Sequence, residues 1–454
     1  MTTDSVPMTR LPLLAAPRPG STFARRVDGP VTVETFLGDV AALAAQLPPC
    51  RHVVNLCRDR YRFAVGFAAA LCRRQVNLLP PHDAPDMLEQ LAIDYPDLYC
   101  LTDTAAPAGR ASFEYPSALL HAATQHAMPR FAADQPAAVL FTSGSTGRPQ
   151  PHDRSWGDLV NSALAAGERL GIASLGAASL LGTVPHQHSY GLESVLMLAL
   201  QHGLVLHAER PFFPADVVAA LAAAPHPRLL VTTPVHLRIL LAQPGELPQL
   251  AMLLSATAPL SASLAREAEV RFAAPLYEIY GCSEAGQIAA RRTAQNEEWR
   301  CLAGITLRQD AAGTWASGIP IAVETLLSDA IELRNPEQFL LLGRIADLVN
   351  IAGKRASLAH LNHHLNAIDG VLDGAFVATD DDGDTVSRLV AFAVAPGLSV
   401  DAILTELRQR IDAAFLPRPL HLVPALPRNT LGKLPRDEIA RLLAESARGS
   451  AVRG

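Results

Sequence analysis

Lysine is nearly absent from this sequence. Of the 38 basic residues only two are lysines, Lys354 and Lys433, which leaves 38 − 2 = 36 arginines. Arginine can replace lysine wherever a solvated positive charge suffices, but it does not reproduce a compact ammonium that must reach one oxygen atom. The two lysines are therefore candidate functional residues.

Charged residues are also scarce, at 18% of the 454 residues against about 25% in ordinary soluble domains, while 49% are apolar. This composition excludes wholesale disorder, and the net charge of −6 argues against a nucleic-acid partner. No run reaches the ~18 consecutive apolar residues of a membrane helix, so we expect a cytoplasmic protein without stable membrane insertion. The six cysteines form no CxxC pair and are expected to be reduced thiols.

Short apolar runs alternate with helix-patterned stretches through most of the chain. Helical spacing recurs at residues 33–47, 61–74 and 158–170, and strand-like runs lie at 53–57, 76–80, 137–141, 180–184, 205–208, 229–233, 252–256 and 276–280. This alternation is typical of α/β proteins with mostly parallel, helix-covered sheets.

The pattern changes near residue 345. Two expected helices, at 358–368 and 400–414, enclose two expected strands that an acidic turn connects. We therefore predict a large N-terminal α/β domain of residues 1–345 and a smaller α+β lid domain of residues 348–454.

The strongest local motif, FTSGSTGRP, follows the apolar run at 137–141. Its glycines let the backbone approach a ligand closely, and its four hydroxyls can donate hydrogen bonds to phosphate oxygens. A P-loop is excluded, because Arg148 and Pro149 follow Gly147 where that motif needs lysine. The alternative is an ordinary surface loop.

Two other polar clusters follow apolar runs. In Tyr280-Gly281-Cys282-Ser283-Glu284 the ring can stack on a base and the carboxylate can hold Mg²⁺. The segment PHQHSYG at 185–191 has two histidines and a tyrosine, but no third metal ligand nearby. Each cluster taken alone is equally consistent with a structural turn.

Taken in order, these segments resemble the adenylate-forming superfamily, which includes acyl-CoA synthetases, aryl-CoA ligases and the adenylation domains of peptide synthetases. The resemblance runs from about residue 60 to the C-terminus. It assigns ATP and AMP binding to Thr142, Ser143, Gly144, Ser145, Thr146, Gly147, Ala258, Pro259, Tyr280, Gly281, Cys282, Ser283, Asp329 and Arg344. It assigns the acid pocket to His188, Tyr190, Gly191, Gly281 and Gly286, Mg²⁺ to Glu284 and Thr142, the thiol acceptor to Gly353, Lys354 and Arg355, and catalysis to Lys433, Glu284 and His188.

The resemblance also implies a two-step reaction. The carboxylate of an acid attacks the α-phosphorus of ATP and releases pyrophosphate, and a thiol then displaces AMP while the C-terminal domain rotates about a hinge near residues 345–347. The implied function is an ATP- and Mg²⁺-dependent ligase for a small aromatic or medium-chain acid. The acceptor would be an acyl carrier protein or alternatively free coenzyme A. Five arginines of the C-terminal domain are candidates for docking an acidic carrier protein, and the alternative is that they are scattered solvated charges: Arg355, Arg388, Arg408, Arg410 and Arg418.

Two positions depart from the family pattern. The phosphate loop usually ends in Pro-Lys, whereas this chain has Pro149-Gln150, and the usual Asp or Lys of the hinge is Ala346. These departures leave open a catalytically impaired nucleotide-binding regulator on the same fold. The retained Lys433 and Glu284 argue against that alternative.

Overall fold

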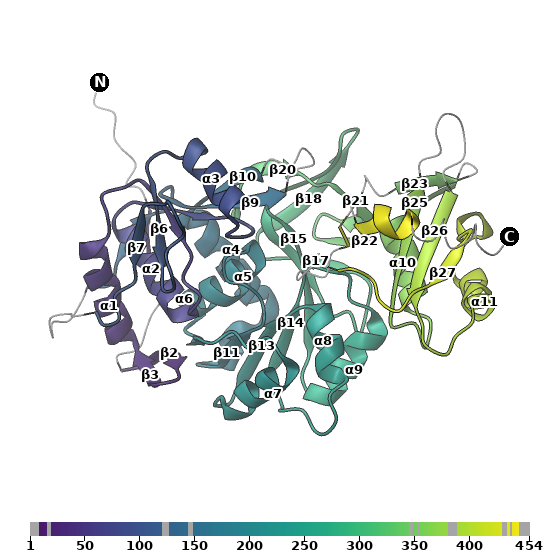
Figure 1. Ribbon diagram of the computed structural model, residues 1–454, viewed down its shortest axis with the longest axis horizontal. Helices are drawn as coiled ribbons and strands as arrows, with labels where there is room; N and C mark the ends of the chain where they lie inside the picture. Colours follow the sequence, from purple (N-terminus) through teal and green to yellow (C-terminus); the bar gives the residue numbers. More distant parts are fainter. Residues whose placement is uncertain are drawn as a thin grey trace.

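The computed structural model describes residues 9–15, 20–119, 127–143, 149–344, 348–351, 354–379, 388–428, 434–435 and 438–444. Within these ranges the chain is an α/β protein with two large mixed sheets, and its C-terminal part lies beside the larger body (Figure 1). No helix in the described ranges is both long and apolar enough to cross a membrane.

The first sheet has six strands in the order β10-β9-β5-β4-β6-β7, and its strands are parallel except for β10, which pairs antiparallel with β9. Its elements are β4 (His52–Asn55), α2 (Arg60–Cys72), β5 (Val76–Leu79), α3 (Pro85–Asp94), β6 (Leu98–Thr102), β7 (Ser112–Glu114), β9 (Pro136–Ser143) and β10 (Pro149–Ser155). The chain goes from β4 to β5 on one side and then returns to β6 on the other side. Such a reversal opens a crevice at the carboxyl ends of the strands.

The second sheet has eleven strands in the order β21-β22-β17-β16-β15-β14-β13-β11-β12-β2-β3. Parallel strands form its centre, from β2 to β15, and the strands beyond β15 are antiparallel. The strands are β2 (Thr22–Arg26), β3 (Gly29–Thr32), β11 (Ser179–Gly182), β12 (Val205–His207), β13 (Arg228–Thr232), β14 (Met252–Ser255), β15 (Leu276–Cys282), β16 (Gly286–Arg291), β17 (Trp299–Cys301), β21 (Asp329–Asn335) and β22 (Gln338–Arg344). The antiparallel margin was not anticipated from the sequence.

Other elements cover or flank these sheets. The helices are α1 (Val33–Gln46), α4 (Trp156–Leu170), α7 (Pro214–Ala223), α8 (Pro234–Leu241) and α9 (Ala262–Phe272). The helices expected at 33–47, 61–74 and 158–170 correspond to α1, α2 and α4. Two strands, β1 (Arg10–Pro12) and β8 (Arg130–Ala132), form a small pair, and β18 (Ile305–Asp310), β19 (Gly313–Gly318) and β20 (Ile321–Leu326) form a three-stranded antiparallel sheet.

Helix α2 contacts strands of both large sheets and is buried along most of its length. Its cap is Asp59, whose side chain accepts a hydrogen bond from the N–H of Arg62. The guanidinium of Arg60 is fully buried, and burial lowers its pKa to about 9. It donates to the backbone carbonyls of His207 (3.1 Å), Glu209 (2.9 Å), Gly182 (3.0 Å) and Val184 (3.3 Å). Arg60 therefore ties the first residue of α2 to the ends of β11 and β12.

The C-terminal part contains a small mixed sheet with two helices. Its elements are β23 (Leu348–Ile351), β24 (Lys354–Ser357), α10 (Leu358–Asn366), β25 (Asp373–Thr379), β26 (Arg388–Val394), α11 (Val400–Arg410) and β27 (Leu420–Leu422). The strand pair expected after residue 370 is present as β25 and β26. The helix expected at 400–414 ends at Arg410, because Ile411 is extended and a short 3-10 turn follows at Ala413–Phe415.

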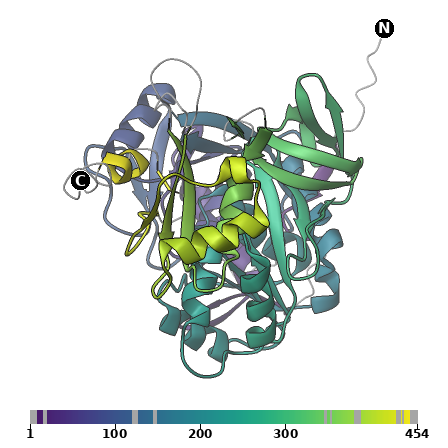
Figure 2. The ribbon, with the colours of Figure 1, turned by 90° about the vertical axis from the view of Figure 1, so that its right-hand side faces the viewer.

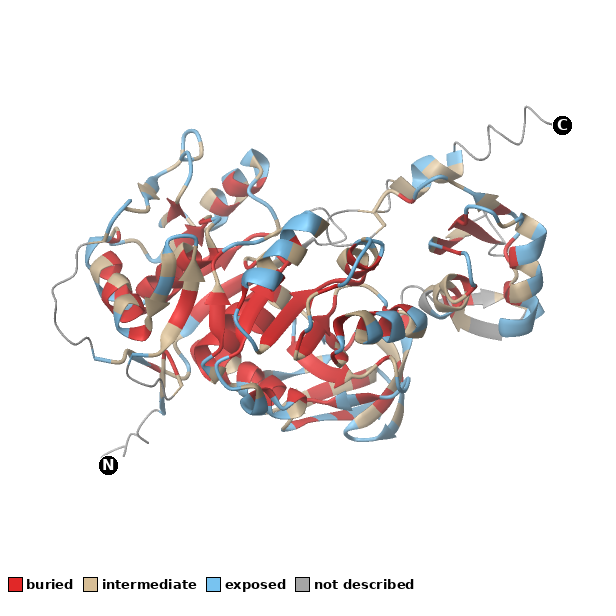
Figure 3. Cartoon of the chain, turned by 90° about the horizontal axis from the view of Figure 1, so that it is seen from below, coloured by how far each residue is buried: buried red, intermediate tan, exposed pale blue. Residues whose placement is uncertain are grey.

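The C-terminal part faces the viewer in Figure 2, and Figure 3 shows buried residues within this part as well as within the larger body. Two apolar clusters of the C-terminal part take all their members from residue 349 onward. The main cluster of the larger body extends from Leu13 to Phe339. The domain boundary near residue 345 stays a prediction, since residues 345–347 lie outside the described ranges.

Candidate active site

The predicted phosphate loop connects two paired strands of the first sheet. The ladder of β9 and β10 places Thr142 opposite Gln150 and Ser143 opposite Pro149. The remaining loop residues, Gly144, Ser145, Thr146 and Gly147, lie outside the described residues. The described residues Thr142 and Ser143 thus lie at the carboxyl end of a strand parallel to β5, where α/β proteins commonly bind ligands.

Three of the predicted nucleotide residues come together at the margin of the second sheet. The hydroxyl of Tyr280 donates a 2.7 Å hydrogen bond to the carboxylate of Asp329. Asp329 begins β21 and is paired with Arg344 at the end of β22. The Tyr280 ring is buried and packs against both Trp299 and Phe339, with ring centroids 5.7 Å away in each case. The sequence places Asp329 and Tyr280 far apart, and the antiparallel margin brings them into contact.

The turn between β15 and β16 presents Glu284. Gly281 and Gly286 shape it: a Cβ on Gly281 would collide with the carbonyl of Gly286, and Gly286 has a φ of +78°. Ser283 is partly buried and the Glu284 side chain is exposed. Burial raises the pKa of the neighbouring Cys282 thiol to about 12. A single exposed carboxylate suits Mg²⁺, which proteins commonly hold through one or two carboxylates together with substrate phosphates and water.

Arg154 holds this turn from the first sheet. It is 7% exposed, and its guanidinium donates to the carbonyls of Ser283 (2.5 Å) and Glu284 (3.1 Å). No motif in the sequence marks Arg154, which lies in the polar strand PQPHDRS after the phosphate loop. Its role depends on contacts with Ser283 and Glu284, which lie 129 and 130 positions further along the chain.

Glu193 contacts the end of the same turn at Gly286 and Gln287 and is another residue that the sequence analysis missed. The Glu193 side chain is 2% exposed. Its carboxylate accepts hydrogen bonds from Ser162 Oγ (2.8 Å), Ser189 Oγ (2.8 Å) and the N–H of Gln287 (3.1 Å). Because a Cβ on Gly286 would lie 3.1 Å from this carboxylate, Glu193 and the glycine fit closely against each other.

The segment 185–191 turns sharply from β11 into a helix. His188 directly precedes α5 (Ser189–Gly191), which continues as a π-helical stretch (Leu192–Met197) and then α6 (Leu198–His202). Gly191 allows this turn, since a Cβ there would collide with the carbonyl of Pro185. The hydroxyl of Tyr190 is buried and finds no hydrogen-bond partner among the described residues. Irregular π-helical turns are frequent at functional sites.

His186, unlike His188, is a buried structural residue. Its Nε2 lies 2.9 Å from the carbonyl of Cys57, while its Nδ1 has no partner among the described residues. Burial lowers the pKa of His186 to about 3, and the charge of Arg60 adds to this effect. His186 is therefore neutral at ordinary pH, with its proton on Nε2.

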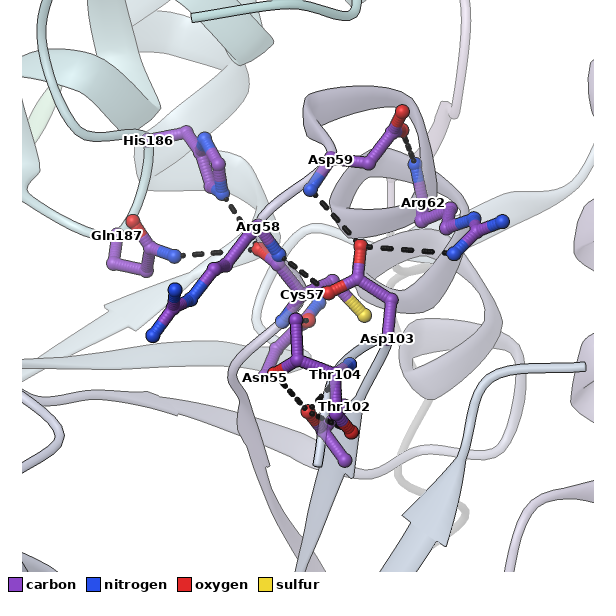
Figure 4. A network of polar contacts seen from close by, with 10 residues as sticks. All are labelled: Asn55, Cys57, Arg58, Asp59, Arg62, Thr102, Asp103, Thr104, His186 and Gln187. Atoms are coloured by element: carbon purple, nitrogen blue, oxygen red, sulfur yellow. Dashed lines mark hydrogen bonds and ion pairs between the residues drawn. The ribbon is translucent and has the colours of Figure 1, made fainter. Parts of the chain in front are cut away.

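The loop that His186 contacts is also held from the opposite side (Figure 4). The carboxylate of Asp103, after β6, accepts the N–H groups of Arg58 (2.8 Å) and Asp59 (3.0 Å) and lies 4.0 Å from Arg62. The side-chain amide of Gln187 donates to the Cys57 carbonyl at 3.4 Å. The segment 185–191 is thereby joined to the loop after β4.

That loop forms one wall of a cleft of about 290 Å³ at the carboxyl ends of β4, β5 and β6. Arg58 and Arg110 are basic residues of its lining, and Asp83 and Glu89 are acidic ones. The cleft lies where the chain reverses direction across the first sheet, the position at which open α/β sheets commonly bind ligands.

The predicted adenine turn follows β14. Thr257 has a φ of +78°, which is uncommon for a β-branched residue and marks a strained turn, and Ala258 and Pro259 follow it. The N–H of Leu260 donates to Glu278 of β15 at 3.1 Å, and Glu278 forms an ion pair with Arg291 at 2.7 Å. The turn is thus fixed beside the strand that leads to Tyr280.

The remaining predicted residues belong to the C-terminal part. Lys433, Gly353 and Ala346 lie outside the described residues. Lys354 and Arg355 form the start of β24, paired with Ile351 and Asn350, and their side chains are not described. No group of three or more His, Cys, Asp or Glu side chains able to hold a metal occurs in the described part of the chain.

Comparison with known proteins places the chain in a family. Residues 46–313 match the family model for AMP-binding enzymes. The 4-coumarate–CoA ligase of Rhodobacter capsulatus is 30% identical over 301 residues, which cover 65% of this chain and 74% of that enzyme. The chain therefore belongs to the AMP-binding enzyme family, the adenylate-forming superfamily, and its class is that of AMP-forming acid–thiol ligases.

Solved structures share the fold. The ATP-bound MatB of Rhodopseudomonas palustris has a TM-score of 0.79 at 17% identity, and the match covers 94% of this chain and 96% of that one. The o-succinylbenzoate coenzyme A synthetase of Bacillus subtilis, in complex with ATP and a magnesium ion, has a TM-score of 0.79 at 17% identity and covers 95% of this chain. The same alignment covers 100% of the synthetase chain. ATP use by this chain follows from its family.

Proposed function

We propose that this ligase activates a small aromatic or medium-chain carboxylic acid as an acyl-adenylate and transfers the acyl group to the phosphopantetheine thiol of an acyl carrier protein. The main support for the nucleotide site is the hydrogen bond between Tyr280 and Asp329. Arg344 lies opposite Asp329 in the strand ladder, and Glu284 lies on the turn that follows β15. Mg²⁺ would be held by Glu284 and Thr142 and would offset the negative charge of the triphosphate.

In the first step, an oxygen of the acid carboxylate bonds to the α-phosphorus of ATP and the bond to pyrophosphate breaks. Lys433 would place its ammonium between the carboxylate and the phosphate, where charge builds up. In the second step a thiolate attacks the acyl carbon and AMP leaves. Gly353, Lys354 and Arg355 would then face the pantetheine arm after rotation of residues 348–454 against residues 1–345.

The acid pocket would be formed by His188, Tyr190, Gly191, Gly281 and Gly286. The buried hydroxyl of Tyr190 supports an acid that brings a polar group, since an unpaired buried hydroxyl costs about 1–3 kcal/mol. The name of the Rhodobacter relative, a 4-coumarate–CoA ligase, also supports an aromatic acid.

The acceptor has two candidates. Exposed arginines on the C-terminal part, Arg408, Arg410 and Arg418, support an acidic carrier protein, although Arg410 also pairs with Glu406. The cleft lined by Arg58 and Arg110 supports free coenzyme A, because guanidinium groups bind phosphates in bidentate geometry, although Asp83 and Glu89 of the same lining offset their charge. The hydrogen bonds from His186 and Gln187 to the Cys57 carbonyl connect residues 185–191 to the loop that forms one wall of this cleft. This connection also favours coenzyme A.

One experiment tests the activity and then the acceptor. Pyrophosphate release is measured with ATP, Mg²⁺ and a panel of aromatic and medium-chain acids. The best acid is then offered with a holo acyl carrier protein, with the apo carrier as control, or with coenzyme A. A holo-specific mass increase of one acyl group supports the carrier, and acyl-CoA alone assigns the acceptor to coenzyme A. ATP binding without turnover of any acid would instead support the impaired regulator.

A further inference from the structure

The turn that presents Glu284 lies beyond the end of a strand ladder. The ladder between β15 and β16 ends with Cys282 paired to Gly286, so the carbonyls of Ser283 and Glu284 lie beyond it. The ladder is also irregular between Tyr280 and Gly281. A turn of this kind needs an anchor from outside if its carboxylate is to keep one position.

Arg154 is that anchor. A guanidinium is a rigid planar fork of donors, and here two of its nitrogens donate to two successive carbonyls of the turn. Hydrogen bonds from an ionised donor are stronger than neutral ones, and the low exposure of Arg154 reduces competition from water. A neutral or shorter side chain at this position would leave the carbonyls without this pair of donors.

The backbone of Arg154 is itself fixed on both sides. Arg154 pairs with Ala138 across the β9–β10 ladder. The next residue, Ser155, caps α4 in a reciprocal arrangement: Ser155 Oγ accepts from the N–H of Asp158, and the Asp158 carboxylate accepts from the N–H of Ser155. Arg154 therefore links two parts of different sheets, the hairpin that includes the phosphate loop and the turn that presents Glu284.

Distance excludes a different role for Arg154, that of the missing loop lysine. Gln150 stands where the family has lysine, and it lies four residues from Arg154 on the same strand. Four residues of strand span about 13 Å, and the Arg154 guanidinium is engaged at Ser283 and Glu284. The charge of Arg154 is thus committed to the turn and does not stand in for the loop lysine.

We propose that Arg154 is a positioning residue: it fixes the separation between Thr142, near the end of β9, and the turn that presents Glu284, so that Mg²⁺ and the triphosphate of ATP are held together. This inference rests on the proposed nucleotide site, but not on which acid or which thiol is used. Arg154 acts through the backbone of the turn and not by contact with the substrate.

The test compares ATP binding with and without Mg²⁺ in the wild type, Arg154→Met and Arg154→Lys by calorimetry. The matched control is Arg169→Met, because Arg169 is also partly buried and donates to one backbone carbonyl, that of Cys301 at 2.8 Å. In Arg154→Met we expect the gain in ATP affinity that Mg²⁺ provides to fall about 10- to 100-fold, as is usual when the group orienting a metal ligand is lost. Arg154→Lys, which keeps the charge but not the fork, should fall in between, and Arg169→Met should match the wild type.

A second measurement separates positioning from general damage. Thioester formation from supplied acyl-adenylate requires neither Mg²⁺ nor a triphosphate, so it should change little in Arg154→Met while pyrophosphate release falls. An equal loss of both half-reactions, or an unchanged Mg²⁺ effect on ATP affinity, overturns the proposal. If Arg154→Met does not fold, Arg154→Lys decides by the same criteria. A wild type that binds Mg²⁺ and ATP but activates no acid refutes the proposed function and leaves the binding test of Arg154 intact.

Discussion

Lowering the pH should decrease the free energy of unfolding because His186 is buried in its neutral form. The size of the effect follows from the surroundings of its ring. The pKa of His186 falls from 6.5 to about 3 on folding, chiefly because the ring is buried. A second proton would have to go on Nδ1, which is buried and has no partner among the described residues. Protonation therefore places an unpaired charge inside the protein, close to the guanidinium of Arg60.

The direction and the magnitude can be worked out together. Between pH 6.5 and pH 3 the unfolded chain binds this proton and the folded chain does not, so stability falls as the pH is lowered through that window. Above pH 6.5 the contribution of His186 is constant. At pH 5 the loss relative to pH 8 amounts to about 2 kcal/mol from this one residue.

Urea unfolding at pH 8, 7, 6 and 5 measures the loss, and the variant His186→Gln isolates it. Glutamine can still donate to the Cys57 carbonyl but does not titrate. Other buried histidines, among them His207 with a pKa lowered to about 4, also contribute to the pH dependence of the wild type. The informative quantity is therefore the difference between variant and wild type, with the exposed His82→Gln as control. If His186→Gln loses as much stability between pH 8 and pH 5 as the wild type, the assignment of His186 as a buried neutral residue is wrong.

Three further predictions concern the reaction. Lys433→Ala should reduce pyrophosphate release about 10²- to 10³-fold while sparing thioester formation from supplied acyl-adenylate, and survival of both half-reactions would contradict its role. Tyr280→Phe removes the donor to Asp329 and should weaken ATP binding about fivefold, equivalent to roughly 1 kcal/mol, as measured by calorimetry. An unchanged affinity would mean that this hydrogen bond does not orient Asp329 for the nucleotide. If coenzyme A occupies the cleft, the double variant Arg58→Ala/Arg110→Ala should raise its KM about three- to tenfold, most at low salt, with acid activation unchanged, whereas equal KM values would remove the cleft as its site.

Local pattern was sufficient to predict the elements at the centre of the fold. Helices α1, α2 and α4 and strands β4, β5, β9 and β11 to β15 appear close to the expected positions, because their apolar patterns are set by neighbours in the sequence. The parallel strands β2, β6 and β7 were not predicted. The order of the motifs was sufficient to identify the family. The antiparallel strands from β16 to β22 were missed, since short strands of mixed polarity give a weak periodic signal.

The supporting residues of the site were missed for a different reason. Arg154 and Glu193 resemble ordinary polar residues until the fold places them against a turn more than 90 positions away. Asp103 acts in the same way on the loop after β4. Long-range contacts of this kind leave no local spacing to recognise, whereas glycine-rich turns and hydroxyl clusters do.

The buried guanidinium of Arg60 has a consequence for dividing this chain. Its four carbonyl partners come from two stretches that begin more than 120 residues after it. A fragment that ended before β11 would retain the cation and lose every one of those acceptors, so an isolated first sheet would have to hydrate or expel the side chain at the cost of its packing. Shuffling of segments between relatives should therefore keep residue 60 and the ends of β11 and β12 from the same parent.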